Sequence, residues 1–305
     1  MMKAYLKIWR LGLFHLWAVL IAMCGIAEAG GGAGPEIRAA VSILPQADVV
    51  SRIGGRHAAV QVLVGPGQSP ATYEPSPRQM AGLARCRVYF RIGTPFEETL
   101  VPKISSLFPA LRIVDTRKGI RLRYFKGSAG PRSPDPHVWL DPKRLRIQAG
   151  TVSRALAELA PALAGEITGN LGRFEREIDR LDAEISRMLA PFRGRRFYVF
   201  HPAFGYFADA YGLVQVAVEA GGRPPGPRRL SRLIRRARAD GVRVLFVQPQ
   251  YARRDAAAIA EAIGARVVPL DPLPRDCIKG IMKMAVAVRD GLQEQAAGPG
   301  PREKQ

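Results

Sequence analysis

Two histidines of this sequence stand in surroundings that could hold a metal ion. Beyond residue 29 the chain has only three histidines, His57, His137 and His201. His137 lies in SPDPHVWLDP (133–142), where two Asp-Pro pairs favour a turn, and His201 directly follows the apolar run RFYVF (196–200). Imidazole together with carboxylate suits a divalent transition metal, zinc especially. His57, in a Gly-Gly-Arg-His turn, is expected to be a surface residue.

A carboxylate stands at the end of another strand-like run. Asp271 follows VVPL in VVPLDPL (267–273). Ligand sites of open α/β sheets form beyond the carboxyl ends of strands, and His201, Asp271 and the loop around Ala71 all meet that condition. A single aspartate at such a place usually caps a helix or turn, and a single histidine is usually structural. The metal hypothesis therefore depends on these positions meeting in space.

The elements that would position these residues form two series. In the first, apolar strand-like runs alternate with helical ones, and Ser76-Pro77 is a typical helix start. The second series begins near Arg196 and ends with a helix over 277–292. The expected strands are 37–44, 58–65, 86–93 and 111–115, then 196–200, 213–219, 242–248 and 265–270. This alternation of strands and helices predicts an α/β fold of two lobes, each a mainly parallel sheet with flanking helices.

One long helix is predicted between the two series. Its apolar residues recur at spacings of four and three from Ile167 to Met188, and Pro191 ends the pattern. We expect a helix that joins the two lobes; a coiled-coil dimer seam is the alternative, and three heptads is the minimum for one. The predicted organisation is a signal peptide (1–29), an N-terminal metal-binding lobe (36–165), a linking helix (166–191), a C-terminal metal-binding lobe (195–293) and a disordered tail (294–305).

The first 29 residues have the features of an export signal. Lys3, Lys7 and Arg10 precede an apolar stretch, and Ala27-Glu28-Ala29 fits a cleavage site. The stretch is short for a membrane anchor. Cys24 as a lipid-modified cysteine is the less favoured alternative, because Ala22-Met23 matches that signal poorly. We therefore expect a periplasmic protein.

Export would leave Cys86 and Cys277, which lie far apart in the sequence. A disulfide is possible in an oxidising compartment, but two buried free thiols are expected. Two cysteines without a CxxC pair also argue against a thiolate metal site.

The chain is strongly basic, with a formal charge of +20. Removing the three basic residues and one acidic residue of the signal would leave +18. The densest run, 228–243, places leucine and isoleucine at helical spacing opposite its arginines, which predicts an amphipathic helix with a solvated face. No aromatic stacking series or nucleic-acid motif accompanies it, so no nucleic-acid partner is expected.

Several segments of the sequence resemble the solute-binding proteins of zinc and manganese ABC importers (cluster A-I). The resemblance covers about residues 37 to 290. It is carried by GPGQSPATYEPSPRQMAGLARCRVYFRIGTPFE, DPHVWLDP, FHPAFGYFADAYGL and VPLDPL. The second and third of these are quite specific. The resemblance implies two α/β lobes joined by a long helix, with a divalent metal between them.

The resemblance also implies a set of metal ligands. His137, His201 and Asp271 match three of the family's ligand positions, but Ala71 stands where the family has a histidine in P-H-x-Y-E-P. Water or Glu74 is expected to fill the fourth position, and Tyr73 is a weaker candidate. A histidine at position 201 favours Zn²⁺, with Mn²⁺ possible. Residues 116–136 contain no histidine, so the His-rich loop of many zinc members is absent.

The resemblance therefore implies a monomeric receptor, not an enzyme, that binds metal and delivers it to an ABC permease and its ATPase. Two alternatives stay open. The Ala71 substitution could mean that metal binding is lost or altered. Two histidines, an aspartate and an open position also form the pattern of a zinc hydrolase, with Glu74 as base, although no HExxH motif is present.

Overall fold

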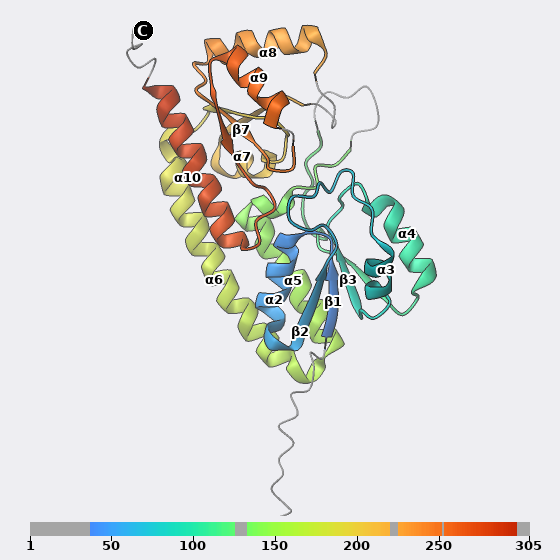
Figure 1. The fold of residues 1–305 in the computed structure, drawn as a ribbon. Helices are drawn as coiled ribbons and strands as arrows, with labels where there is room; N and C mark the ends of the chain where they lie inside the picture. The colour runs from blue at the N-terminus through green and yellow to red at the C-terminus, as the bar shows by residue number, and fades with distance from the viewer. Residues whose placement is uncertain (1–36, 126–132, 220–224, 252, 298–305) are drawn as a thin grey trace, which may run out of the picture. The chain divides into compact units, whose positions relative to one another are not determined.

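The computed structural model describes residues 37–125, 133–219, 225–251 and 253–297. The expected export signal and Cys24 lie outside the described residues. The segment from Pro35 onward forms one compact unit that contains two α/β lobes. Figure 1 shows the lobe with β1–β3 below and the lobe with β7, α8 and α9 above.

The first lobe is built on a four-stranded parallel sheet of order β2-β1-β3-β4. Its strands are β1 (Ile37–Val41), β2 (Ala58–Val62), β3 (Val88–Arg91) and β4 (Arg112–Asp115). Its helices are α2 (Leu44–Gly54), η1 (Gly55–His57), α3 (Pro77–Leu83), α4 (Glu97–Leu107), η2 (Val138–Leu140), α5 (Pro142–Leu159) and η3 (Pro161–Leu163). The alternation of strand and helix confirms the predicted class.

Two helix starts of this lobe follow from local sequence. Ser76 caps α3 in a reciprocal arrangement with Gln79, and Pro77 occupies the first helical position, as predicted. The prediction of one strand over 37–44 was too long, because β1 ends at Val41 and α2 begins at Leu44. Pro45 lies in the first turn of α2, where its missing N–H breaks no helical hydrogen bond.

The second lobe repeats the architecture with sheet order β6-β5-β7-β8, again all parallel. Its strands are β5 (Arg196–Val199), β6 (Val214–Ala217), β7 (Val244–Val247) and β8 (Arg266–Pro269). Its helices are α7 (Gly205–Tyr211), α8 (Pro227–Ala239), α9 (Arg253–Ile263) and α10 (Cys277–Ala296). Neighbouring residues of β5 and β7 enter different core clusters, so both faces of this sheet are covered.

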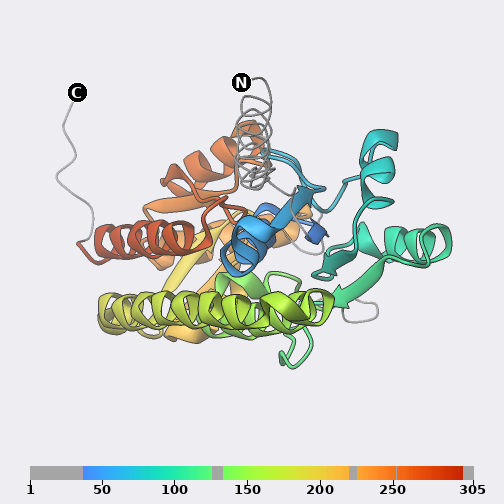
Figure 2. The same cartoon turned by 90° about the horizontal axis from the view of Figure 1, so that it is seen from below.

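The predicted linking helix is α6 (Ala164–Leu189), which has 26 residues and is followed by η4 (Ala190–Phe192). At ~1.5 Å per residue it is about 39 Å long. It packs against α2 and α5 of the first lobe and against α10. Figures 1 and 2 both show α10 beside α6. The apolar stripe therefore packs within this chain, as expected of a helix that joins the two lobes.

Most of the predicted stripe on α6 is buried, and one polar residue joins it. Asn170 is 8% exposed, and its side-chain N–H donates to the carbonyl of Ile53 at 2.8 Å. This bond satisfies a carbonyl near the end of α2 that would otherwise lack a partner. Leu171 and Met188, by contrast, are only half-buried.

The C-terminal helix extends further than the sequence indicated. We expected it to end at Leu292 and a tail to start at 294, but α10 continues to Ala296. Glu294 pairs with Arg266, and Gln295 donates to the carbonyl of Asp240 at 2.6 Å, so the last turn is held by side-chain contacts. The rest of the expected tail, 298–305, lies outside the described residues.

Both cysteines of the described chain are free thiols. Cys277 is buried, as expected, and its Sγ lies 2.9 Å from Oδ2 of Asp48. Cys86 is only half-buried, which corrects the expectation that both are buried.

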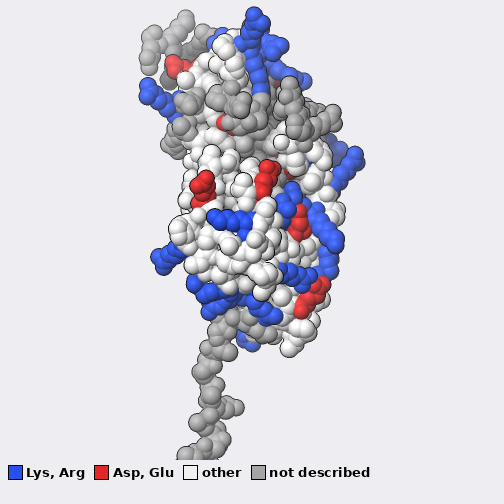
Figure 3. Space-filling view, turned by 90° about the vertical axis from the view of Figure 1, so that its right-hand side faces the viewer, with Lys and Arg blue, Asp and Glu red and all other residues white. Residues whose placement is uncertain are grey.

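On the face drawn in Figure 3, basic side chains are spread over several places rather than gathered at one. In α8 the apolar positions Leu233, Ile234 and Ala237 face inward, while Arg228, Arg232 and Arg235 are exposed, as predicted. Within the described residues, no helix is both long enough and apolar enough to span a membrane.

Candidate metal-binding site

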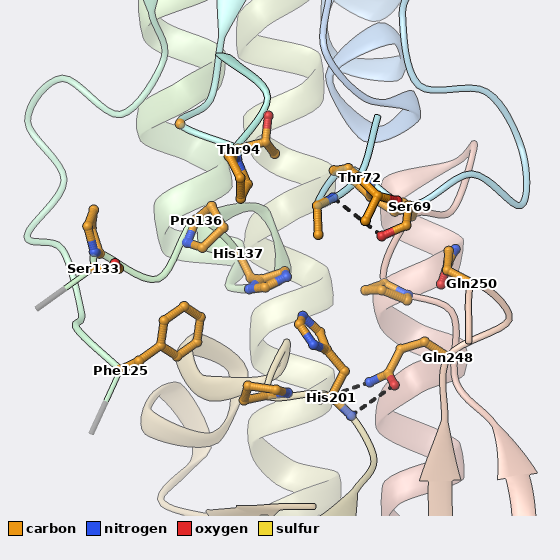
Figure 4. A pocket seen from close by; sticks show the side chains of 18 of the residues that line it. Ser69, Thr72, Thr94, Phe125, Ser133, Pro136, His137, His201, Gln248 and Gln250 are labelled. Carbon is orange, nitrogen blue, oxygen red and sulfur yellow. Dashed lines mark hydrogen bonds between the residues drawn. The ribbon is translucent and has the colours of Figure 1, made fainter. Parts of the chain in front are cut away.

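A cleft of about 510 Å³ lies at the carboxyl ends of the strands of both lobes. The first lobe contributes the loop around Ala71, the turn at Thr94 and the segment around His137. The second lobe contributes residues around His201, Gln250 and Pro272. Figure 4 shows these side chains converging on the cleft from both lobes.

The turn at Thr94 is fixed by a carboxylate buried beneath it. Glu97 has no exposed surface and accepts hydrogen bonds from the backbone N–H groups of Ile92 (2.9 Å) and Gly93 (2.6 Å). Gly93 has φ +84°, and a Cβ there would lie 1.9 Å from the Arg117 side chain. Only glycine fits this position.

His137 is held by the buried carboxylate of Asp135. Oδ1 of Asp135 accepts from the backbone N–H of His137 at 3.0 Å and lies 2.7 Å from its Nδ1. Asp135 itself is 2% exposed. A carboxylate at Nδ1 retains the proton on that nitrogen, so the lone pair of Nε2 is available to a metal.

Three other residues of DPHVWLDP, Trp139, Asp141 and Pro142, have structural roles. Trp139 donates its indole N–H to the carbonyl of Pro272 at 2.6 Å, which connects this segment to the second lobe. Asp141 caps α5 by accepting from the backbone N–H of Lys143 at 2.8 Å, and Pro142 begins the helix. The motif therefore positions one imidazole and joins the two lobes.

His201 follows β5, and a buried glutamine fixes its backbone. Gln248, 1% exposed, accepts from the N–H of His201 at 3.1 Å and donates to its carbonyl at 2.9 Å. Gln248 follows β7, the neighbour of β5 in the sheet. Residues that follow two adjacent parallel strands, β5 and β7, thus fix the position of His201.

Two further side chains contact the ring of His201. Its Nδ1 lies 2.7 Å from Oε2 of Glu219 and 2.7 Å from the hydroxyl of Tyr251. The Tyr251 ring stacks on the imidazole, with centroids 5.0 Å apart and planes 25° apart. Because Glu219 accepts the proton of Nδ1, Nε2 of this histidine is also the free nitrogen.

Burial favours the neutral forms of His201 and Tyr251. It lowers the pKa of His201, an effect that the hydrogen bond to Glu219 partly opposes. Burial, and then the charge of Glu219, raise the pKa of Tyr251, which therefore remains a phenol. A neutral imidazole is the form that binds metal.

The structure brings His137 and His201 together from opposite lobes. Their ring centroids are 5.4 Å apart and their planes differ by 71°. Figure 4 shows the two rings pointing toward one another across the cleft. Their exposed fractions, 12% and 16%, show that the pair is partly shielded from solvent.

Asp271 lies near this pair but does not join it in the structure. It follows β8, as predicted, and its Oδ1 accepts from Gln250 Nε2 at 3.0 Å and from the backbone N–H of Leu273 at 2.9 Å. Its side chain is exposed, whereas the following Pro272 and Leu273 line the cleft.

The loop around Ala71 faces the cleft, but its proposed ligand does not. Ala71 and Thr72 line the cleft, whereas Glu74 is exposed and is not among the lining residues. Tyr73 is buried, and its hydroxyl donates to Gln79 at 2.8 Å. Burial also raises the pKa of Tyr73, so its phenol is a poor ligand.

Among the described side chains, no group of three or more His, Cys, Asp or Glu is arranged to hold a metal ion. His137 and His201 form the only pair from the predicted set that meets. His57 lies elsewhere, 3.2 Å from Glu166, as expected of a residue outside the site.

Sequence reasoning missed the residues that orient the two imidazoles. Asp135 was within the motif that indicated His137, two residues before it. Glu219 ends the apolar run LVQVAVE, so a carboxylate at a strand end was the available signal. Tyr251 and Gln248 gave no such signal, because their role depends on the packing of neighbouring strands.

Comparison with known proteins identifies the family of this chain. The model of the family described as zinc-uptake complex component A, periplasmic, matches residues 40–280. The chain belongs to this family. The match extends over both lobes and includes His137, His201 and Asp271.

Individual relatives of this chain share a quarter to a third of its residues. A putative metal-binding protein of Chlamydia trachomatis is 29% identical over 250 residues, which are 81% of this chain and 88% of that protein. The high-affinity zinc uptake system protein ZnuA of Brucella suis is 24% identical over 337 residues, covering 92% and 98%. A solved zinc-bound ZnuA deletion mutant is 34% identical, with TM-score 0.80 and coverage of 87% and 99%.

Family membership establishes the class of this protein. It is a metal-binding receptor of the ABC import type, and its family and structural neighbours are transport proteins rather than enzymes. The family description places its members in the periplasm.

Proposed function

We propose that this protein captures zinc in the cleft between its lobes and delivers it to an ABC import permease driven by an ATPase. The observation that carries the proposal is the pair of imidazoles, His137 and His201, which face each other at 5.4 Å from opposite lobes. A buried carboxylate orients each ring. Such carboxylate–histidine pairs are the usual outer support of zinc sites.

The proposed ligands are His137, His201 and Asp271. To reach the metal, the carboxylate of Asp271 must leave Gln250 and Leu273. Its loop already contacts the first lobe, where the carbonyl of Pro272 accepts from Trp139. Glu74 is the least favoured of the proposed ligands, because its side chain is exposed and does not line the cleft. A metal that bridges both lobes favours a closed arrangement, and the permease would recognise that arrangement.

Nitrogen ligands favour zinc over manganese in this proposal. Imidazole suits Zn²⁺, whereas Mn²⁺ prefers carboxylate, carbonyl and water oxygens. The names of the relatives support the same choice, because several are described as zinc uptake proteins. We further propose a monomer, exported by residues 1–29, that binds metal without catalysis.

Equilibrium dialysis of the purified protein against zinc and manganese tests the proposal. One zinc ion per chain, held more tightly than manganese, is the expected result. In cells, deletion of the gene should abolish zinc import. The deletion strain should then grow poorly in zinc-depleted medium and recover when zinc is added. Tight binding of neither metal would contradict the proposal.

The substitution at Ala71 favours a second candidate, a receptor with altered metal binding. It rests on the observation that the described side chains form no group of three metal ligands. The hydrolase alternative gains no support, because its proposed base, Glu74, does not line the cleft.

A further inference from the structure

A buried tyrosine of the second lobe contacts the segment that carries His137. Tyr206 lies in α7 and has no exposed surface. Its hydroxyl donates to the backbone carbonyl of Asp135 at 3.0 Å and accepts from the backbone N–H of Arg123 at 2.8 Å. Both partners belong to the first lobe, so one hydroxyl group bonds the second lobe to the backbone of the first.

The two backbone partners of Tyr206 are also bonded to each other. The N–H of Asp135 donates to the carbonyl of Arg123 at 2.9 Å. That bond uses one polar group of each residue, and the tyrosine hydroxyl pairs with the remaining two. All four backbone groups at this point therefore have partners. Loss of the hydroxyl would leave one donor and one acceptor without this partner, which favours a shift of the segment.

Side chains of the first lobe hold the ring of Tyr206 in place. The guanidinium groups of Arg123 and Arg144 lie 5.8 Å and 4.7 Å from its centroid. Arg123 also pairs with Asp209, a second residue of α7. A Cβ at Gly205 would lie 2.8 Å from Nε of Arg123, so a glycine at the start of α7 permits this close approach. The contact is thus a packed junction between α7 and the first lobe.

Asp135 connects this junction to the proposed metal ligand. Its Oδ1 accepts from the backbone N–H of His137 at 3.0 Å and lies 2.7 Å from Nδ1 of the ring. Its backbone carbonyl is the acceptor of Tyr206. Because the carbonyl and the carboxylate belong to one residue, a shift of the backbone at Asp135 also moves the oxygen that orients the imidazole. The second lobe therefore takes part in orienting a histidine of the first.

From these contacts we propose that Tyr206 is a positioning residue for zinc capture, which sets the orientation of His137 by holding the backbone of Asp135. This inference rests on the proposed function, in which His137 is a ligand. His201 and Asp271 keep the ligand roles proposed above. Movement of α7 away from Asp135 would displace the carboxylate that orients His137, so this ligand of the first lobe depends on the contact between the lobes.

The first test compares two variants of α7 that each lose one buried hydroxyl. Tyr206→Phe removes the bond to Asp135. Tyr211→Phe is the matched control, because Tyr211 is 4% exposed and its hydroxyl donates to Asp182 of α6 at 3.0 Å. In zinc titrations below the onset of unfolding, Tyr206→Phe should bind about 10–100-fold more weakly than the parent, the usual cost of losing an outer partner. Tyr211→Phe should bind like the parent, and equal affinities of the two variants would overturn the inference.

A double-mutant cycle with Asp135→Asn separates positioning from a general loss of stability. Asp135→Asn removes the carboxylate at Nδ1 of His137. If Tyr206 acts through that carboxylate, Tyr206→Phe should cost less than about threefold in zinc affinity once it is gone, because the two losses are coupled. Losses that multiply in full would mean that the hydroxyl acts by another route, which contradicts the proposal.

The tautomer of His137 gives a readout that needs no metal. In nitrogen-15 spectra of the metal-free protein at about pH 8, the parent and Tyr211→Phe should have the proton of His137 on Nδ1, and Tyr206→Phe should show a mixture of both tautomers. An unchanged tautomer in Tyr206→Phe would refute the positioning role. Failure of the parent to bind zinc would overturn the proposed function, whereas the spectra would still decide whether Tyr206 orients this ring.

Discussion

Trp139 donates its indole N–H to the carbonyl oxygen of Pro272 at 2.6 Å, and this bond joins the segment of His137 to the loop of Asp271. Both residues are buried at the cleft. The bond is a fixed contact between the lobes beside the proposed metal, so it limits how far they can separate there.

Replacing Trp139 by phenylalanine tests this contact. The ring is largely kept, but the buried carbonyl of Pro272 loses its donor. We expect the free energy of unfolding to fall by about 1–3 kcal/mol, the cost of an unsatisfied buried polar group. Urea unfolding of metal-free protein measures it. Unchanged stability would show that the carbonyl finds another donor.

Glu219→Gln tests the support of His201. An amide cannot accept from Nδ1 as strongly as a carboxylate, and the ring loses its fixed tautomer. Removal of such outer partners typically costs about 10–100-fold in metal affinity, and that is the expected loss of zinc affinity. Glu166→Gln, which removes the partner of His57, is the matched control and should have no effect. Equal affinities for both variants would refute the role of Glu219.

Zinc affinity should depend on pH through the histidines. Protons compete with zinc for imidazole, and burial lowers the pKa of His201 below its ordinary value of about 6.5. Protonation of His201 should therefore leave the zinc affinity unchanged above about pH 6.5. The affinity should fall with decreasing pH, by about tenfold per unit once the lowered pKa is passed. Zinc titrations at several pH values between 8 and 5 measure the profile. A steep loss between pH 8 and 7 would contradict the account.

Ala71→His should tighten binding of free zinc by at least an order of magnitude, at about 1.4 kcal/mol per tenfold. Ala71 lines the cleft with both imidazoles, so a histidine there is placed to reach the same metal. Glu74→Gln should be silent, because Glu74 lies outside the cleft. No gain from Ala71→His would mean that this loop does not approach the metal.

The sequence predicted the elements better than the contacts between them. Alternating strands and helices and the stripe from Ile167 are local patterns, and both lobes and α6 match them. Errors occurred at element ends, where Pro45 and the side chain of Gln295 decided the boundary. Such ends depend on single capping or tertiary contacts.

For the site, residue types and strand ends were enough to indicate His137 and His201. The carboxylates that orient them were not found, because Glu219 reaches His201 across neighbouring strands of the sheet. The exposure of Asp271 and Glu74 was equally beyond a sequence argument, since it depends on how the loops of both lobes pack.

The most direct test is a zinc titration of His137→Ala and His201→Ala beside the parent and His57→Ala. Trp139 is the only tryptophan beyond residue 29, and its ring lies 5.2 Å from that of His137, so its fluorescence can follow binding. The account predicts one tight zinc site in the parent and in His57→Ala, and loss of tight binding in each of the other two variants. If both titrate like the parent, the cleft between the two histidines is not the metal site.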